Sequence, residues 1–113
     1  MSKKLAAFLT IITLLAITAM PLAAQATRTL QGQVMKSGDA PLPGAVVYLK
    51  NTKTLAVRTF VSDDKGNYRF ASLSPNVDYE IYAEYKGAKS DTKTLSAFDS
   101  RSTATINLKV NAG

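Results

Sequence analysis

The feature that most constrains the fold is a series of turn signals, each followed by a segment in which apolar and polar residues alternate. Three such units lie between residues 42 and 85, with turns at 43–44, 63–67 and 75–78. Alternation with a period of two places the apolar side chains on one face of a strand, while Gly, Pro, Asn and Asp supply the turns. No stretch after Ala26 has helical periodicity, so the pattern predicts an all-β domain.

We predict seven strands at short, regular spacing, which favours an antiparallel Greek-key sandwich. Residues 63–67 are the strongest hairpin signal, with Gly66 at positive φ, and residues 89–97 form a polar edge strand. In the third strand, residues 55–61, the alternation places Phe60 on the outer face. The predicted inward residues are Leu30, Val34, Ala45, Val47, Leu49, Val57, Thr59, Val61, Tyr68, Phe70, Tyr79, Ile81, Ala83, Ile106, Leu108 and Val110.

Residues 1–26 have the features of a cleavable signal peptide. Lys3 and Lys4 precede an apolar run over residues 5–20, Pro21 follows, and Ala24-Gln25-Ala26 offers small residues for cleavage. The run is shorter than the ~20 residues of a membrane-spanning helix, although an uncleaved anchor is the alternative. We therefore expect a mature domain over residues 27–113, exported to the periplasm or the extracellular medium and not stably inserted in a membrane.

Composition excludes several classes of function. The chain has no histidine and no cysteine, which removes the usual general base, most zinc ligands and the Ser-His-Asp and Cys-His arrangements. The formal charge of +6 falls to +4 without Lys3 and Lys4, because 12 basic and 8 acidic residues remain. The basic residues, Arg28 among them, are spread along the chain and are interpreted as solvated, so we expect no nucleic-acid partner.

The acidic residues do not indicate catalysis or a metal. Glu80 and Glu84 are four residues apart on one strand, so their backbones lie roughly 13 Å apart at ~3.3 Å per residue, and no other group nearby supports acid–base chemistry. Residues 63–67 offer carboxylates, but the chain that follows lacks the further oxygen ligands of a calcium loop. We expect no enzyme activity, no cofactor and no metal.

Several motifs in the turns and strands also resemble a known family. They are Gly32-Gln33-Val34, then Gly44-Ala45 with Val47 and Leu49, then Ser62-Asp63 with Gly66, Tyr68 and Phe70, and finally Leu73, Pro75 and Tyr79. Together they resemble the carboxypeptidase regulatory-like domain, a transthyretin-like or prealbumin-like module, over most of residues 29–110. The resemblance implies a prealbumin-like sandwich and a role without chemistry of its own. The longer turn over residues 76–78 departs from the family pattern.

In that family the second, third and fifth strands share a sheet, which would place Tyr48, Phe60 and Tyr82 on one outer face with Glu80 and Glu84. Aromatic rings beside hydrogen-bonding groups suit the faces of sugars, so these five residues are the candidate ligand site. Pairing of the rings across strands is the alternative. The family fold is also similar to that of starch-binding-like modules.

We therefore expect an exported, monomeric binding or accessory module, with a glycan or another component of the cell envelope as its ligand. The alternative is a structural or adaptor sandwich that pairs with another envelope protein.

Overall fold

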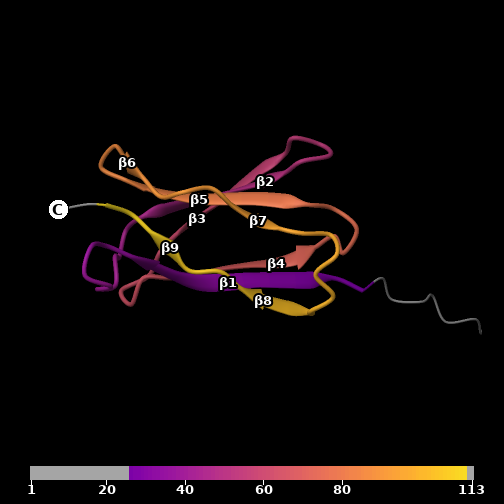
Figure 1. Ribbon diagram of the computed structural model, residues 1–113, viewed down its shortest axis with the longest axis horizontal. Helices are drawn as coiled ribbons and strands as arrows, with labels where there is room; N and C mark the ends of the chain where they lie inside the picture. The colour runs from indigo at the N-terminus through magenta and orange to yellow at the C-terminus, as the bar shows by residue number, and fades with distance from the viewer. Residues whose placement is uncertain (1–25, 112–113) are drawn as a thin grey trace, which may run out of the picture.

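The structure is a computed structural model, and it describes residues 26–111, which form a two-layered β-sandwich (Figure 1). Apart from Ala26, the predicted signal peptide lies outside the described residues. Every regular element in residues 26–111 is a strand, as the alternation predicts. Within this range no helix is long and apolar enough to cross a membrane.

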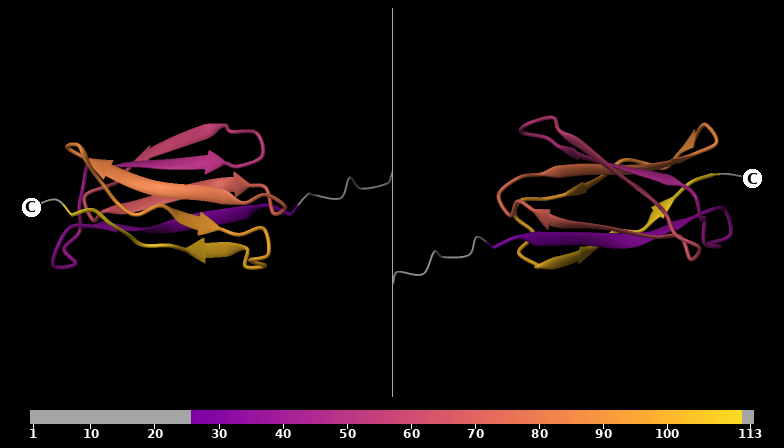
Figure 2. Two further views of the ribbon diagram at one scale, coloured as in Figure 1. Left: turned by 45° about the horizontal axis from the view of Figure 1, so that its top comes forward. Right: turned by 180° about the vertical axis from the view of Figure 1, so that it is seen from behind.

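The sandwich consists of two sheets that pack face to face, and Figure 2 shows these layers from two further sides. The first sheet has β1 at its centre: β4 (Asn67–Leu73), β1 (Arg28–Met35) and β8 (Thr103–Thr105), with β9 (Leu108–Lys109) also beside β1. The second sheet has β2 and β5 at its centre: β3 (Val57–Val61), β2 (Val46–Asn51), β5 (Tyr79–Tyr85) and β6 (Ala88–Lys89), with β7 (Lys93–Leu95) also beside β5.

All seven predicted strand regions are present, but two of them differ from the prediction. The predicted sixth strand is divided into β6 and β7, and the last strand into β8 and β9. The prediction of purely antiparallel pairing is also wrong, because β8 and β9 run parallel to β1. Turn signals and alternation reveal where strands lie, but they carry no information on the direction of a partner that is distant in sequence.

The core lies between the sheets and contains most of the predicted inward residues. The largest fully buried side chains belong to Leu30, Val34, Val47, Leu49, Tyr68, Phe70, Leu73, Ile81, Leu95, Leu108 and Val110. Leu95 lies on the segment whose facing the polar sequence does not indicate. The alternation therefore identifies the core in five of the seven regions.

In β3 the predicted facing is wrong. Register pairs Val57, Thr59 and Val61 with Lys50, Tyr48 and Val46 of β2, which lie on the outer face. Phe60 instead lies on the inner side and makes an edge-to-face contact with Phe70, with 6.1 Å between ring centres. All five residues of β3 are nevertheless exposed, because β3 pairs with β2 alone at the edge of its sheet.

The turn over residues 63–67 forms, but it is not a hairpin. The Asp63 carboxylate accepts hydrogen bonds from the backbone N–H groups of Lys65 and Asn67, each at 2.9 Å, and Gly66 has a φ of 77°. The turn passes from β3 in the second sheet to β4 in the first, and no ladder joins these two strands. Turn chemistry therefore predicted the local backbone, whereas the partner of each strand depends on the packing of the sheets.

Arg28, interpreted above as solvated, is 3% exposed and lies at one end of the sandwich. Its guanidinium donates to backbone carbonyls of two loops: to Ser74 at 3.0 Å, to Val77 at 2.7 Å and to Ser96 at 2.6 Å. A buried charge is tolerated only where such bonds replace its hydration. Arg28 therefore fastens the start of β1 to the loops before β5 and after β7.

The last strand crosses β1 at Gly32, where it is divided into β8 and β9. The Tyr68 ring lies beside Gly32, and its hydroxyl donates to the backbone carbonyl of Ile106. A Cβ on Gly32 would lie 1.9 Å from the Ile106 oxygen and 2.9 Å from the Tyr68 ring. Only a residue without a side chain allows this crossing.

We predict that Gly66→Val destabilises the domain far more than Lys65→Ala does. A β-branched residue resists positive φ, and a Cβ at position 66 would lie 2.5 Å from the Val34 carbonyl oxygen. The Lys65 side chain is exposed, so its loss should change the free energy of unfolding by about 0.5 kcal/mol or less. Urea unfolding of both variants measures the difference, and equal effects would contradict the assigned backbone.

We predict that Tyr68→Phe lowers the free energy of unfolding by about 1–3 kcal/mol, because it leaves the Ile106 carbonyl without its donor. Tyr82→Phe is the control, since its ring lies on the outer face, and it should change stability by about 0.5 kcal/mol or less. Urea unfolding compares the two variants. Equal losses would show that the Tyr68 hydroxyl contributes nothing specific.

Candidate functional site

Four of the five predicted site residues lie together on the outer face of the second sheet. Register places Tyr48 opposite Tyr82, while Lys50 and Val46 lie opposite Glu80 and Glu84. Each of the four is half-buried. Phe60 does not belong to this group, because it faces the other way. We call Tyr48, Tyr82, Glu80 and Glu84 the aromatic face.

The two rings of the aromatic face stack on one another. Their centres are 4.9 Å apart with 16° between the planes. The Lys89 ammonium lies 5.2 Å from the centre of the Tyr82 ring, on the strand at the opposite side of β5 from Tyr48. The faces of Tyr82 are thus occupied from both sides, which favours the cross-strand pairing considered above over an open platform for a sugar.

The carboxylates of the aromatic face also have cationic neighbours. Glu80 lies 3.6 Å from the Lys50 ammonium, and both side chains are about half exposed, at 42% and 45%. Glu84 is opposite Lys89 in the ladder between β5 and β6. Exposed pairs of this kind contribute little to stability, and here they leave the face close to neutral.

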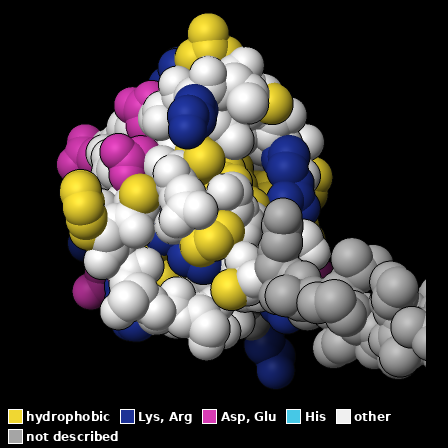
Figure 3. Space-filling view, turned by 90° about the vertical axis from the view of Figure 1, so that its right-hand side faces the viewer, with side chains coloured by type: hydrophobic (Ala, Val, Ile, Leu, Met, Phe, Trp, Pro, Cys, Tyr) yellow, Lys and Arg dark blue, Asp and Glu magenta, His cyan; other side chains and the backbone are white. Residues whose placement is uncertain are grey.

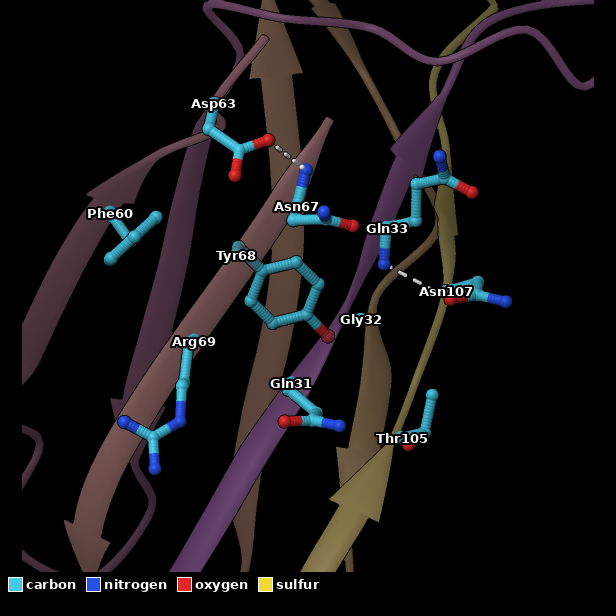
Figure 4. A pocket seen from close by; sticks show the side chains of 10 residues that line it. All are labelled: Gln31, Gly32, Gln33, Phe60, Asp63, Asn67, Tyr68, Arg69, Thr105 and Asn107. Atoms are coloured by element: carbon cyan, nitrogen blue, oxygen red, sulfur yellow. Dashed lines mark hydrogen bonds between the residues drawn. The ribbon is translucent and has the colours of Figure 1, made fainter. Parts of the chain in front are cut away.

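A second surface is a groove of about 500 Å³ on the first sheet (Figure 4). Three neighbouring strands supply polar side chains to it, because register places Gln31 between Arg69 and Thr105 and pairs Gln33 with Asn67. Asn107 and Asp63 complete its polar lining, and Phe60 lies at its margin. We call it the amide groove, after its two glutamines and two asparagines.

The amide groove presents hydrogen-bonding groups of both kinds. The side-chain Oδ1 of Asn107 accepts a hydrogen bond from the backbone N–H of Gln33 at 3.0 Å, which leaves the side-chain NH₂ of Asn107 directed elsewhere. The Gln33 amide donates to the Lys65 carbonyl at 2.8 Å. Arg69, Gln31 and Asn67 are exposed on the same face. The groove therefore combines donors, acceptors and the aromatic rings of Phe60 and Tyr68.

Sequence reasoning did not find the amide groove. Its side chains do follow the outward positions of the alternation, since Thr105 and Asn107 flank the predicted inward residue Ile106. They come from residues 31–33, 67–69 and 105–107, however, and these segments meet only because β1 pairs with β4 on one side and β8 on the other. No local signal indicates that arrangement.

Neither surface has the residues of a metal centre or an acid–base pair. Among residues 26–111, no group of three or more His, Cys, Asp or Glu side chains could hold a metal ion. Burial raises the pKa of Tyr68, whose hydroxyl is already bonded to a carbonyl. The hydrogen bond from Arg101 lowers the pKa of Asp99 to about 2, at a half-buried position outside the groove.

The distribution of charge agrees with the spread seen in the sequence. Figure 3 shows one end of the molecule, where Lys and Arg side chains are scattered among neutral ones and the acidic side chains lie to one side. Proteins that bind nucleic acids usually concentrate basic side chains on one face.

A family model described as "Carboxypeptidase regulatory-like domain" matches residues 29–111, while no curated protein sequence matches the chain. Similar solved structures include the major pilin subunit BcpA of Bacillus cereus, in its D312A form, at 18% identity and a TM-score of 0.59, with 76% of this chain and 30% of that chain covered. Catechol 1,2-dioxygenase of Acinetobacter sp. ADP1 is 14% identical with a TM-score of 0.60, and the match covers 82% of this chain and 54% of that chain. Shaft pilin SpaA of Lactobacillus rhamnosus GG is 14% identical with a TM-score of 0.54, and the match covers 76% of this chain and 47% of that chain.

This chain therefore spans between about a third and about half of those proteins. Likeness at such low identity shows a shared sandwich fold, and it does not carry the activity of a dioxygenase or the assembly of a pilin to this chain.

We predict that the stacked rings of Tyr48 and Tyr82 are coupled. In a double-mutant cycle, the loss of unfolding free energy in the Tyr48→Ala/Tyr82→Ala double variant should differ from the sum of the two single losses by about 0.5–1.5 kcal/mol. This is the usual range for an aromatic pair. Chemical denaturation of the original protein, the two single variants and the double variant measures this coupling free energy. Strict additivity would show that the rings do not support one another and are free to receive a ligand.

Proposed function

The chain belongs to the carboxypeptidase regulatory-like domain family, and on that premise we propose that it is an exported, non-catalytic binding module for a glycan of the cell envelope. Export rests on the signal-like residues 1–26, and a non-catalytic role rests on the lack of histidine and cysteine. The observation that carries glycan recognition is the amide groove, with its exposed aromatic margin.

The chemistry of the groove suits a neutral, polyhydroxylated ligand. Asn, Gln, Thr and Arg side chains donate to and accept from hydroxyl groups, and the ring of Phe60, which is 38% exposed, can contact the C–H face of a sugar. Arg69 and Asp63 contribute one charge of each sign, which does not favour a strongly charged ligand. Sheet positions also fix the backbones of Gln31 and Arg69 relative to one another.

A glycan array with the purified protein, followed by calorimetry on the best ligand, tests the proposal. Arg69→Ala should weaken binding by about tenfold or more, because it removes a donor of several bonds from the lining of the groove, and a loss of about 1.4 kcal/mol corresponds to tenfold. Arg101→Ala is the matched control, since it removes an exposed arginine that does not line the groove. Its affinity should be unchanged.

The same array separates the groove from the aromatic face. Loss of binding in Tyr82→Ala, with Arg69→Ala unaffected, would place the ligand on the aromatic face and overturn the assignment to the groove. No binding to any glycan on the array, or equal affinity in all three variants, would contradict glycan recognition by either surface.

A second candidate function, an adaptor that pairs with another envelope protein, is favoured by the apolar side chains exposed along β3 and the loop before it. Leu55, Val57 and Val61 are 65%, 54% and 59% exposed. Apolar side chains grouped on one edge strand are typical of a surface that is covered by a partner.

A further inference from the structure

The edge of β3 carries unpaired backbone groups. At its two ends, the Ala56 carbonyl accepts the N–H of Asn51, and the Ser62 N–H donates to the Ala45 carbonyl. Backbone groups alternate in direction along a strand, so the groups of Arg58 and Phe60 also face β2. Those of Val57, Thr59 and Val61 face away from the sheet, and no other strand among the described residues pairs with them.

This edge lacks the usual protection against pairing. Edge strands are normally blocked by lysine, proline, a bulge or a covering segment. The five residues Val57–Val61 include no lysine or proline, and their ladder with β2 is regular from Val46 to Lys50. The one charged side chain, Arg58, points inward, a device that can also block an edge, but its guanidinium is engaged within the molecule: it donates to the Ala71 carbonyl at 3.0 Å and lies 5.6 Å from the centre of the Phe70 ring.

We propose that a second copy of this chain pairs with β3, antiparallel and about a twofold axis at Thr59. The inference rests on the adaptor function and names its partner. In this register, Val57, Thr59 and Val61, whose backbone groups face away from β2, each form a hydrogen-bonded pair with the other copy. The pairing continues the second sheet across the two molecules, and it replaces the expectation of a monomer.

The sequence of β3 is complementary to itself in this register. Val57 lies opposite the second copy's Val61, and Thr59 lies opposite Thr59, so the outer face gains two valine pairs and a threonine pair. On the inner side Arg58 lies opposite Phe60, where a guanidinium and a ring attract each other. No like charges meet. If the second copy slid by two residues, the twofold axis would move from Thr59 to Arg58. Arg58 would then lie opposite Arg58, which is destabilising.

Single-cysteine variants test the register directly, because the chain has no cysteine of its own. Thr59→Cys should form a disulfide-linked dimer under mild oxidation, since Cα atoms in such a pair are ~5.5 Å apart, within disulfide reach. Val57→Cys is the matched control: its symmetry mate would lie ~13 Å away, too far for a disulfide. A mixture of Val57→Cys and Val61→Cys should form the mixed dimer.

Sedimentation of the cysteine-free protein over micromolar to millimolar concentrations supplies the second measurement. Thr59→Lys, which places like charges opposite each other, should weaken dimerisation by about tenfold or more. Thr94→Lys, an exposed position on the same outer face but on β7, should leave it unchanged. Equal cross-linking of Thr59→Cys and Val57→Cys, or a monomer at every concentration, would overturn the proposal.

A photoreactive benzophenone side chain at position 59, cross-linked in intact exporting cells, distinguishes self-pairing from the adaptor function. Self-linked protein supports pairing with a second copy. Linkage only to a different protein would overturn self-pairing while leaving the adaptor function in place. No linked product would contradict both.

Discussion

The sandwich depends on a crossing that only glycine permits. At Gly32 the last strand passes over β1, and the Ile106 carbonyl occupies the space that a side chain would fill. Tyr68 completes the crossing because its ring covers the bare backbone and its hydroxyl satisfies the carbonyl. The break between β8 and β9 is the consequence, and it allows Ala104 and Leu108, on either side of the crossing, both to be fully buried. The first sheet is closed by this contact rather than by a continuous ladder.

Arg28 ties together the loops at one end of the sandwich. Its guanidinium has five N–H donors in a rigid plane, and it bonds carbonyls of loops 46 to 71 residues away along the chain. This domain has no disulfide to hold such loops, because the chain has no cysteine. A buried cation that bonds to several carbonyls is one way to tie loops together without one, although its desolvation limits the net gain in stability. Nothing in the sequence around Arg28 distinguishes it from the solvated basic residues.

Local signals therefore predicted what local physics decides. Strand positions, the Gly66 conformation and most of the core follow from alternation and turn chemistry, as at Ile81 and Leu108, which are fully buried as predicted. The amide groove and the buried state of Arg28 depend on contacts between segments far apart in the sequence, which one sequence does not encode in any local pattern. The Tyr48–Tyr82 pair lies between these cases, because the facing of each ring was predictable while the stacking needed the register of β2 with β5.

The incorrect facing of β3 has the same cause as its open edge. In Val57–Val61 the branched residues stand at alternate positions, which normally indicates a buried face. That rule assumes that a second layer covers the strand, yet β3 lies at the margin, where Phe70 and the end of β4 are its inner neighbours. The apolar face predicted for a core therefore faces outward, beside backbone groups that no strand of the described chain pairs. Strand-forming residues at such an edge fit the proposal that the strand which completes it comes from a second copy of the chain.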